Sequence, residues 1–288
     1  MKIALIGSTG QLGTDFKKVI PAQFLVNLDY PNFDLTKKDL VREQLLAIRP
    51  DIVINTAAYN LVDRAEDFPE EALAVNYYGV KNLVDVCLEL DCILVHYSSD
   101  YIFGGEDDRR TPYTEEDHPA PINQYGQSKL LGEQEIIKRC QKYFIIRTSG
   151  LFGTAGSEGK GGNFIESIIK KGKETGELKI VDDQFLTPTY TLDLARQSWQ
   201  LMQTEHFGLY HATSEWECSW YEFGREVMKY IDPNIKIIPV KTSEYQLPAQ
   251  RPKYCVLENK KLKELGLNIM RPWAATIPDY LQEKGYLQ

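Results

Sequence analysis

The sequence predicts an α/β fold, in which a doubly wound parallel sheet is followed by a smaller C-terminal α/β cap that binds substrate. Three observations predict it. Short apolar runs rich in β-branched residues alternate with longer helical patterns over the first 150 residues, as in a parallel sheet covered by helices. A glycine-rich turn follows the first run. The second half is less regular, and glycines cluster at 153–162 in a stretch that we expect to be flexible.

The first half contains the predicted sheet and its helices. Strands that are buried on both faces appear as continuous apolar runs, and the segments between them have helical periodicity. The predicted strands are Lys2–Ile6, Phe24–Leu28, Asp51–Asn55, Ile93–Tyr97 and Phe144–Arg147. The predicted helices are Gln11–Ile20, Lys37–Ile48, Pro69–Leu90 and Gln124–Cys140.

The second half predicts the cap. Its expected strands are Leu178–Val181, Leu209–His211 and Lys236–Val240, and its expected helices are Asp193–Met202, Trp220–Tyr230 and one at the C-terminus. We therefore predict a dinucleotide-binding domain over residues 1–150. Residues 151–288 mainly form the substrate-binding domain, with some segments returning to the sheet. Open α/β sheets bind ligands at the carboxyl ends of their strands, so the cap is expected to close the site there.

Composition narrows the function classes. Hydrophobic residues make up 43% and charged residues 26% of 288 residues, an ordinary globular balance. The formal net charge of −8 argues against nucleic acid or an anionic membrane as the main partner. No stretch approaches the ~20 apolar residues of a membrane span, and the short run after Lys2 is no signal peptide. Five cysteines without a CxxC pair indicate free thiols in a reducing compartment, so we expect a cytoplasmic protein.

The first motif is a phosphate-binding turn of Rossmann type, Gly7-Ser8-Thr9-Gly10-Gln11-Leu12-Gly13. The glycines permit a tight turn, close approach of a pyrophosphate and packing of helix on strand, while the helix N-terminus supplies N–H groups. Asp29 ends the second predicted strand, where a carboxylate would bind an adenosine ribose; a surface-loop aspartate is the alternative. No arginine stands beside Asp29, which favours NADH slightly over NADPH.

The second motif pairs a tyrosine with a lysine. Tyr125 and Lys129 are four residues apart in a predicted helix, so both side chains lie on one face. A desolvated ammonium beside the cofactor is expected to lower the phenol pKa from its usual value of ~10. Ser98 and Ser99 end the fourth predicted strand, where a hydroxyl would hydrogen-bond a substrate carbonyl. A serine nucleophile is the rival interpretation, but no GxSxG turn surrounds these serines.

Taken together, these motifs resemble the extended short-chain dehydrogenase/reductase family, and specifically its dTDP-4-dehydrorhamnose reductase subgroup. The similarity runs along nearly the whole chain. It rests on the glycine turn and on the following segments: Arg49-Pro50-Asp51-Ile52-Val53-Ile54-Asn55, Ala57-Ala58-Tyr59, Val62-Asp63-Arg64-Ala65-Glu66, Ser99-Asp100-Tyr101-Ile102-Phe103, Tyr125-Gly126-Gln127-Ser128-Lys129, Arg147-Thr148-Ser149, Asp183-Gln184, Thr187-Pro188-Thr189 and Arg251-Pro252.

The resemblance implies a role for each candidate residue. Tyr125 would donate a proton to the C4 oxygen of a sugar, Lys129 would tune Tyr125 and hold the nicotinamide ribose, and Ser99 would orient the carbonyl. Asn76 would bridge backbone near the site or serve as a packing amide. Further cofactor contacts are expected from Gly7, Thr9, Gly10, Gln11, Leu12, Gly13, Asp29, Asp34, Leu35, Ala57, Ala58, Tyr59 and Ser98. Further substrate contacts are expected from Asp100, Tyr101, Asn163, Phe164 and Arg251, the last at the pyrophosphate.

The implied reaction is NAD(P)H-dependent reduction of the C4 keto group of a nucleotide-linked 6-deoxy sugar. The first candidate substrate is dTDP-4-dehydrorhamnose, which would give dTDP-L-rhamnose. One departure bears on the substrate, because Gly150 follows Ser149 where the subgroup carries a tryptophan against the sugar. Several alternatives stay open. A reductase would act on a related keto sugar or form the other C4 epimer. The protein would otherwise be an epimerase, a dehydratase or a non-catalytic regulatory subunit of methionine adenosyltransferase. No carboxylate set predicts a metal. Pro69–Leu90 and Gln124–Cys140 are expected either to form a homodimer face or to pack on the sheet.

Overall fold

The computed structural model describes residues 1–106, 108–156 and 162–287. Its centre is a Rossmann-like parallel sheet of six strands in the order β10-β5-β4-β3-β1-β2. Strand β1 pairs with β2 on one side. On its other side β3, β4, β5 and β10 follow in chain order. The direction therefore reverses beside β1, where open α/β sheets form their binding crevice. The strands are β1 (Ile3–Ile6), β2 (Leu25–Leu28), β3 (Ile52–Asn55), β4 (Ile93–Ser99), β5 (Tyr143–Thr148) and β10 (Gly208–His211).

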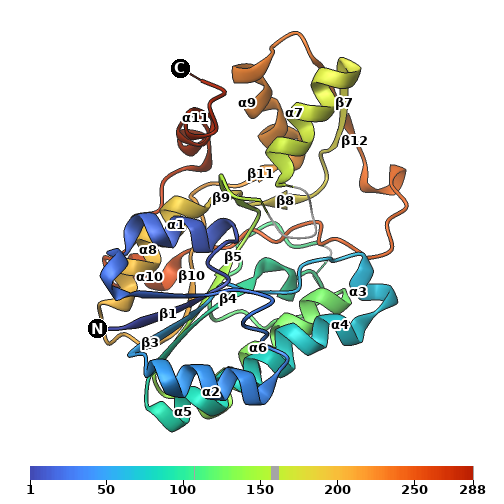
Figure 1. The fold of residues 1–288 in the computed structure, drawn as a ribbon. Coiled ribbons are helices and arrows are strands. Elements are labelled where there is room, and N and C mark those ends of the chain that lie inside the picture. The colour runs from blue at the N-terminus through green and yellow to red at the C-terminus, as the bar shows by residue number, and fades with distance from the viewer. Residues whose placement is uncertain (107, 157–161, 288) are drawn as a thin grey trace.

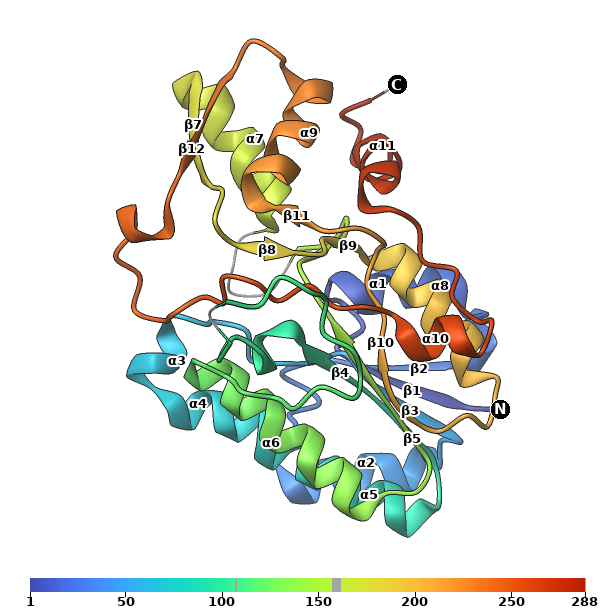
Figure 2. The ribbon, with the colours of Figure 1, turned by 180° about the vertical axis from the view of Figure 1, so that it is seen from behind.

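Helices cover both faces of this sheet, because successive side chains of each strand point to opposite faces (Figures 1 and 2). Ile3 and Leu5 pack with α1, α8 and α10, whereas Ala4 and Ile6 pack with α2, α5 and α6. The helices of this part are α1 (Gln11–Val19), α2 (Lys38–Ile48), α3 (Arg64–Asp67), α4 (Pro69–Leu73), α5 (Val80–Leu90), α6 (Gln124–Arg139), α8 (Thr191–Met202) and α10 (Lys260–Glu264).

A second layer lies above the carboxyl ends of the strands (Figure 1). It has its own apolar core, to which Ile168 of α7, Ile180 of β7 and Phe223 of α9 contribute. Its elements are α7 (Phe164–Thr175), β7 (Glu177–Val181), α9 (Trp220–Ile231), β12 (Lys236–Val240) and α11 (Trp273–Glu283). Two small sheets connect the layers, β6 (Leu151–Phe152) with β9 (Thr189–Tyr190) and β8 (Phe185–Leu186) with β11 (Cys218–Ser219).

Most predicted elements are confirmed to within two residues at each end. The expected single helix Pro69–Leu90 is a correction, because a π-helical turn over Ala74–Gly79 separates α4 from α5. Helices α3, α7 and α10 and the four two-residue strands were not predicted. Helices α3 and α10 and the two-residue strands are too short to show the periodicity on which such predictions rest. Helix α7 has 12 residues and was missed although its buried residues Ile165, Ile168, Ile169 and Gly172 recur at helical spacing.

The apolar positions of α5 and α6 pack mainly against the sheet. Val84 and Cys87 of α5 and Ile136 of α6 belong to the buried cluster on that face. Leu88 and Ile137 are exposed on the outer surface of the same helices. The five cysteines are free thiols, and four of them are buried. No helix within the described residues is long and apolar enough to cross a membrane.

Candidate active site

A cavity of about 1260 Å³ lies between the carboxyl ends of the strands and the upper layer. Segments far apart in the chain line it: the turn after β1, the ends of β2, β3 and β4, the start of α6, and α7, β8 and α9. The predicted site residues line this cavity, with the exceptions of Gly13, Asn76 and Arg251. The structure therefore brings the predicted cofactor, catalytic and substrate residues to one place.

The glycine turn has the geometry that its spacing predicts. Gly7 adopts φ +78°, in the left-handed region that favours glycine, and its N–H donates to the Leu28 carbonyl at 2.9 Å. A Cβ at Gly13 would lie 2.1 Å from the Gly7 carbonyl oxygen, so Gly13 allows helix α1 to approach the turn. Gln11 and Leu12, the first residues of α1, line the cavity. The positive end of the helix dipole thus faces a space that suits a pyrophosphate.

Asp29 is bound to this turn. Its carboxylate accepts hydrogen bonds from the Thr9 N–H at 3.0 Å, the Thr9 hydroxyl at 3.0 Å and the Ser8 hydroxyl at 2.5 Å. Asp34 also lines this end of the cavity, and its carboxylate caps the turn by accepting from Thr36 N–H at 2.9 Å. Among the described lining residues, Lys129 is the single lysine or arginine. This end of the crevice therefore presents carboxylates.

Asn76 lies in the π-helical turn and bridges backbone beside the cavity. Its side chain accepts from the Tyr59 N–H at 3.0 Å and donates to the Tyr59 carbonyl at 2.9 Å. It also donates to the Ser128 hydroxyl of α6 at 3.0 Å. A Cβ at Gly132 would lie 2.3 Å from the Asn76 carbonyl oxygen, so α6 passes very close to this turn. The π-helical turn thus connects the loop after β3 to α6, the helix of Tyr125 and Lys129; such bulges are frequent at functional sites.

Tyr125 and Lys129 both point from α6 into the cavity. The helix starts at Asn123, whose side chain accepts from the Gly126 N–H at 2.7 Å. Burial raises the pKa of Tyr125 to about 12, although a hydrogen bond with Ser99 acts to lower it. Lys129 donates to the Tyr97 carbonyl at 2.6 Å, and burial lowers its pKa to about 8. The sequence led us to expect that Lys129 lowers the phenol pKa; in the chain itself burial raises it, and the lowering influence comes from Ser99.

Asp100 lines the cavity, and its carboxylate is held by donors from three segments. Its Oδ1 accepts from the Ser99 hydroxyl at 2.9 Å, and its Oδ2 accepts from the Ser149 hydroxyl at 2.6 Å and the Cys255 thiol at 3.0 Å. Burial raises the pKa of Asp100, while these three donors act to lower it. Asp100 therefore connects the end of β4, the residue after β5 and the C-terminal segment.

Arg251 lies outside the main cavity. It lines an adjoining cavity of about 400 Å³ whose wall includes Tyr101, Leu61 and Val62, which also line the main one. Its guanidinium forms a bidentate pair with Asp63, at 2.5 and 2.6 Å. The pair fixes the segment around residue 251 to the loop before α3, and a second arginine, Arg64, also lines this cavity.

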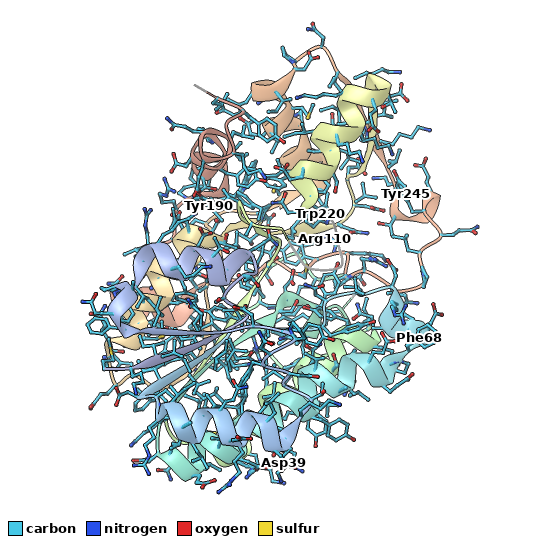
Figure 3. The ribbon with its side chains drawn as sticks, viewed as in Figure 1. Asp39, Phe68, Arg110, Tyr190, Trp220 and Tyr245 are labelled. Carbon is cyan, nitrogen blue, oxygen red and sulfur yellow. The ribbon has the colours of Figure 1, made fainter. Side chains whose placement is uncertain are left out.

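The upper layer supplies residues that sequence reasoning did not find. Asn163 and Phe164 line the cavity as predicted, and Asn163 caps α7 by accepting from the Glu166 N–H at 3.2 Å. Phe185, Leu186 and Trp220 also line it. The capping pattern Ser219…Glu222 marks the start of α9, but nothing in the sequence says which wall Trp220 faces. Figure 3 shows Trp220 at the end of the upper layer that faces the sheet.

Gly150, where the resemblance led us to expect a tryptophan, also lines the cavity. Its φ is +53°, and a Cβ there would lie 2.8 Å from Leu186 Cδ1 and 3.2 Å from Pro188 Cα. A side chain at this position would thus meet β8 and strain the backbone. Within the described residues, no group of three or more His, Cys, Asp or Glu side chains could hold a metal ion.

The comparisons with known proteins agree with this geometry. The family described as the RmlD substrate binding domain matches residues 1–285. The chain is 34% identical to the spore coat polysaccharide biosynthesis protein SpsK of Bacillus subtilis and 32% identical to dTDP-4-dehydrorhamnose reductase of Escherichia coli, covering 98% of each chain in both cases. It superposes with a TM-score of 0.91 on dTDP-4-dehydrorhamnose reductase of Bacillus anthracis in complex with NADP, at 34% identity over 98% of this chain and 100% of that one. The chain therefore belongs to the RmlD family, the RmlD-like NAD(P)H-dependent oxidoreductases.

Proposed function

We propose that this protein reduces the C4 keto group of dTDP-4-dehydrorhamnose with NAD(P)H and forms dTDP-L-rhamnose. The observation that carries the proposal is the convergence of Tyr125, Lys129 and Ser99 in the cavity that the glycine turn opens. The reductase names of the Escherichia coli and Bacillus anthracis relatives support the substrate.

The atoms that line the cavity fit a dinucleotide cofactor. The close approach of α1 to the turn at Gly7 leaves the helix N-terminus open to the cavity. The buried hydroxyl of Ser98 has no hydrogen-bond partner within the structure and belongs to a lining residue. An unpaired buried hydroxyl is costly unless a ligand satisfies it. When bound, the nicotinamide supplies a hydride for the keto carbon.

In this proposal Tyr125 donates its proton to the C4 oxygen as negative charge develops there. Its raised pKa keeps the phenol protonated near neutral pH, as an acid requires. Ser99 holds the carbonyl oxygen beside Tyr125. Lys129 interacts with the nicotinamide ribose and, through its position on the same helix face, with the tyrosine.

Arg251 supports binding of the substrate's diphosphate. A guanidinium can bind phosphate oxygens in pairs, and Arg251 already holds a bidentate geometry with Asp63 beside Tyr101. We propose that the diphosphate extends from the main cavity into the adjoining one and shares this cation with Asp63.

The test is oxidation of NADH or NADPH by purified protein supplied with dTDP-4-keto-6-deoxy-L-mannose, followed by the absorbance of the reduced nicotinamide. Tyr125→Phe should lower kcat by about 10²–10⁴-fold, the usual contribution of a general acid, and still bind cofactor. Tyr113→Phe is the matched control. Tyr113 does not line the cavity, and its buried hydroxyl has no hydrogen-bond partner among the described residues. It should retain wild-type turnover.

Two results would contradict the proposal. Undiminished turnover in Tyr125→Phe would remove the assigned acid. No turnover by the wild type, with cofactor still bound, would replace the substrate by another nucleotide-linked keto sugar. Stoichiometric recovery of a methionine adenosyltransferase with such an inactive protein would then favour a regulatory subunit.

A further inference from the structure

Gln11 belongs to the glycine turn and contacts the upper layer with its side chain. It is the first residue of α1 and lines the cavity. Its Oε1 accepts from the Gly153 N–H at 2.9 Å and from the Asn163 amide at 3.4 Å. Gly153 directly follows β6, and Asn163 is the N-cap of α7. One side-chain oxygen at the start of α1 therefore joins the sheet to the first turn of α7.

Asn163 extends this contact into the upper layer. Its amide also donates to the Gly153 carbonyl at 3.0 Å and to the Tyr280 hydroxyl of α11 at 3.0 Å. The Tyr280 hydroxyl in turn donates to the Glu166 carboxylate of α7 at 2.5 Å. Asn163 and Tyr280 are both buried. Because buried polar groups that lose their partners are costly, these contacts favour one arrangement of α1, α7 and α11.

A second contact holds α1 to the upper layer farther from the cavity. Lys18, near the other end of α1, forms an ion pair with Glu283 of α11. Lys18 does not line the cavity, whereas Gln11 does. A ligand in the cavity therefore acts on the upper layer through Gln11 first, and the Lys18–Glu283 pair keeps the layers attached when Gln11 is changed.

A dinucleotide cofactor would act on Gln11 from the cavity side. The pyrophosphate occupies the free N–H groups in the first turn of a helix, and Gln11 lies in this turn of α1. Its binding restricts the backbone of residue 11 and with it the start of the side chain. The bonds from Gly153 and Asn163 then form at a smaller loss of conformational entropy.

We propose that Gln11 is a positioning residue that couples cofactor binding at the glycine turn to the order of α7 and α11 in the upper layer. This coupling needs only the cofactor. Its consequence for catalysis rests on the proposed function: the upper layer forms one side of the cavity, so a nucleotide sugar should bind more tightly after the cofactor. By linkage, the nucleotide sugar should strengthen cofactor binding by the same factor.

The first experiment is hydrogen exchange of the full-length protein, with and without saturating NADPH. The Glu166 and Ser167 amides report on the start of α7, because both donate to Asn163. NADPH should slow exchange in α7 and α11 of the wild type about 5-fold or more, the usual lower range of a coupling. Gln11→Met, of similar length but without an acceptor, should lose most of this slowing. Gln11→Glu keeps oxygen acceptors and should retain it.

A control variant separates coupling from general loosening of the upper layer. Tyr286→Phe removes the bond from the Tyr286 hydroxyl to Glu166 at 2.9 Å and leaves the contacts of Gln11 in place. It should show the same slowing by NADPH as the wild type. Thermal unfolding should show that all variants are folded. Saturation with NADPH in every sample removes the effect of any change in cofactor affinity.

The second experiment is calorimetric titration with dTDP, with and without NADPH. NADPH should raise the dTDP affinity of the wild type about 5-fold or more, and that of Gln11→Met much less. This factor is a ratio, so a change in the affinity for dTDP alone cancels.

The outcomes distinguish failure of the coupling from failure of the proposed function. Equal slowing of exchange by NADPH in the wild type and in folded Gln11→Met would overturn the coupling. Exchange in wild-type α7 and α11 that NADPH leaves unchanged would also overturn it. Slowing that depends on Gln11, in a protein that binds no dTDP, would uphold the coupling and remove the dTDP-linked substrate from the proposed function.

Discussion

The ammonium of Lys129 lies 2.6 Å from the carbonyl oxygen of Tyr97, so the helix that carries Tyr125 is bound to the strand that carries Ser99. This contact connects the two segments that carry the predicted catalytic residues. It is made by a lysine that is 2% exposed, and burial is the largest influence on its pKa.

The first prediction concerns the pH dependence of stability that Lys129 causes. Its pKa falls from 10.5 to about 8 on folding, so between these values the unfolded chain binds more protons than the folded one. The free energy of unfolding should therefore rise with pH across this window, by about 3 kcal/mol from this residue. Urea unfolding at several pH values, compared with Lys129→Met, should show this rise in the wild type only. Parallel curves for the two proteins would disprove it.

The second prediction concerns Asp100 as a positioning residue. Asp100→Asn removes a carboxylate that accepts from Ser99, Ser149 and Cys255, so the Ser99 hydroxyl loses its fixed direction. Hydrogen bonds to a charged group contribute about 1.5–3 kcal/mol, so kcat should fall roughly 10-fold or more. The KM for the cofactor should stay unchanged. Cys255→Ser keeps a donor to the same carboxylate and should remain active; equal turnover in Asp100→Asn would remove the assigned role.

The third prediction concerns the buried pair Glu133–Arg147. Its Nη2–Oε2 distance is 2.7 Å, and both side chains are at most 4% exposed. Glu133→Gln leaves a buried guanidinium without its counter-charge, which should lower the free energy of unfolding by about 3–5 kcal/mol. Glu89→Gln, in the exposed pair with Arg42, should cost at most about 1 kcal/mol. Chemical denaturation measures both, and similar losses in the two variants would contradict this reasoning.

The fourth prediction concerns Gly150, which lines the cavity. Gly150→Ala and Gly176→Ala both place a side chain at positive φ, at +53° and +70°. Only Gly150 also brings its Cβ within 2.8 Å of Leu186 Cδ1, whereas nothing lies within 4 Å of Gly176. Both should lose about 1–2 kcal/mol from the backbone, and Gly150→Ala should lose more. Equal losses would show that β8 yields freely, and that a larger side chain could be accommodated at the substrate wall.

Local sequence patterns were sufficient to predict the central sheet and the helices that cover it. Apolar runs such as Ile52–Asn55 are buried on both faces, so their strand character appears in the sequence without knowledge of their neighbours. The π-helical turn at Ala74–Gly79 was not predictable in this way, because its periodicity resembles that of an α-helix. It accompanies Asn76 contacts with Tyr59 and Ser128, which are distant in the chain.

The sequence by itself determined the residue types of the chemistry: a glycine turn at 7–13, a tyrosine and lysine on one helix face, and serines at the end of a strand. These depend on spacing within single elements, which local geometry fixes. Only the tertiary structure decided where each side chain points. It directs Lys129 to Tyr97, bonds Asp100 to Ser99, and sets Trp220 on the cavity wall. Burial and contacts between different elements arise only when the layers pack, because neither is a property of a local segment.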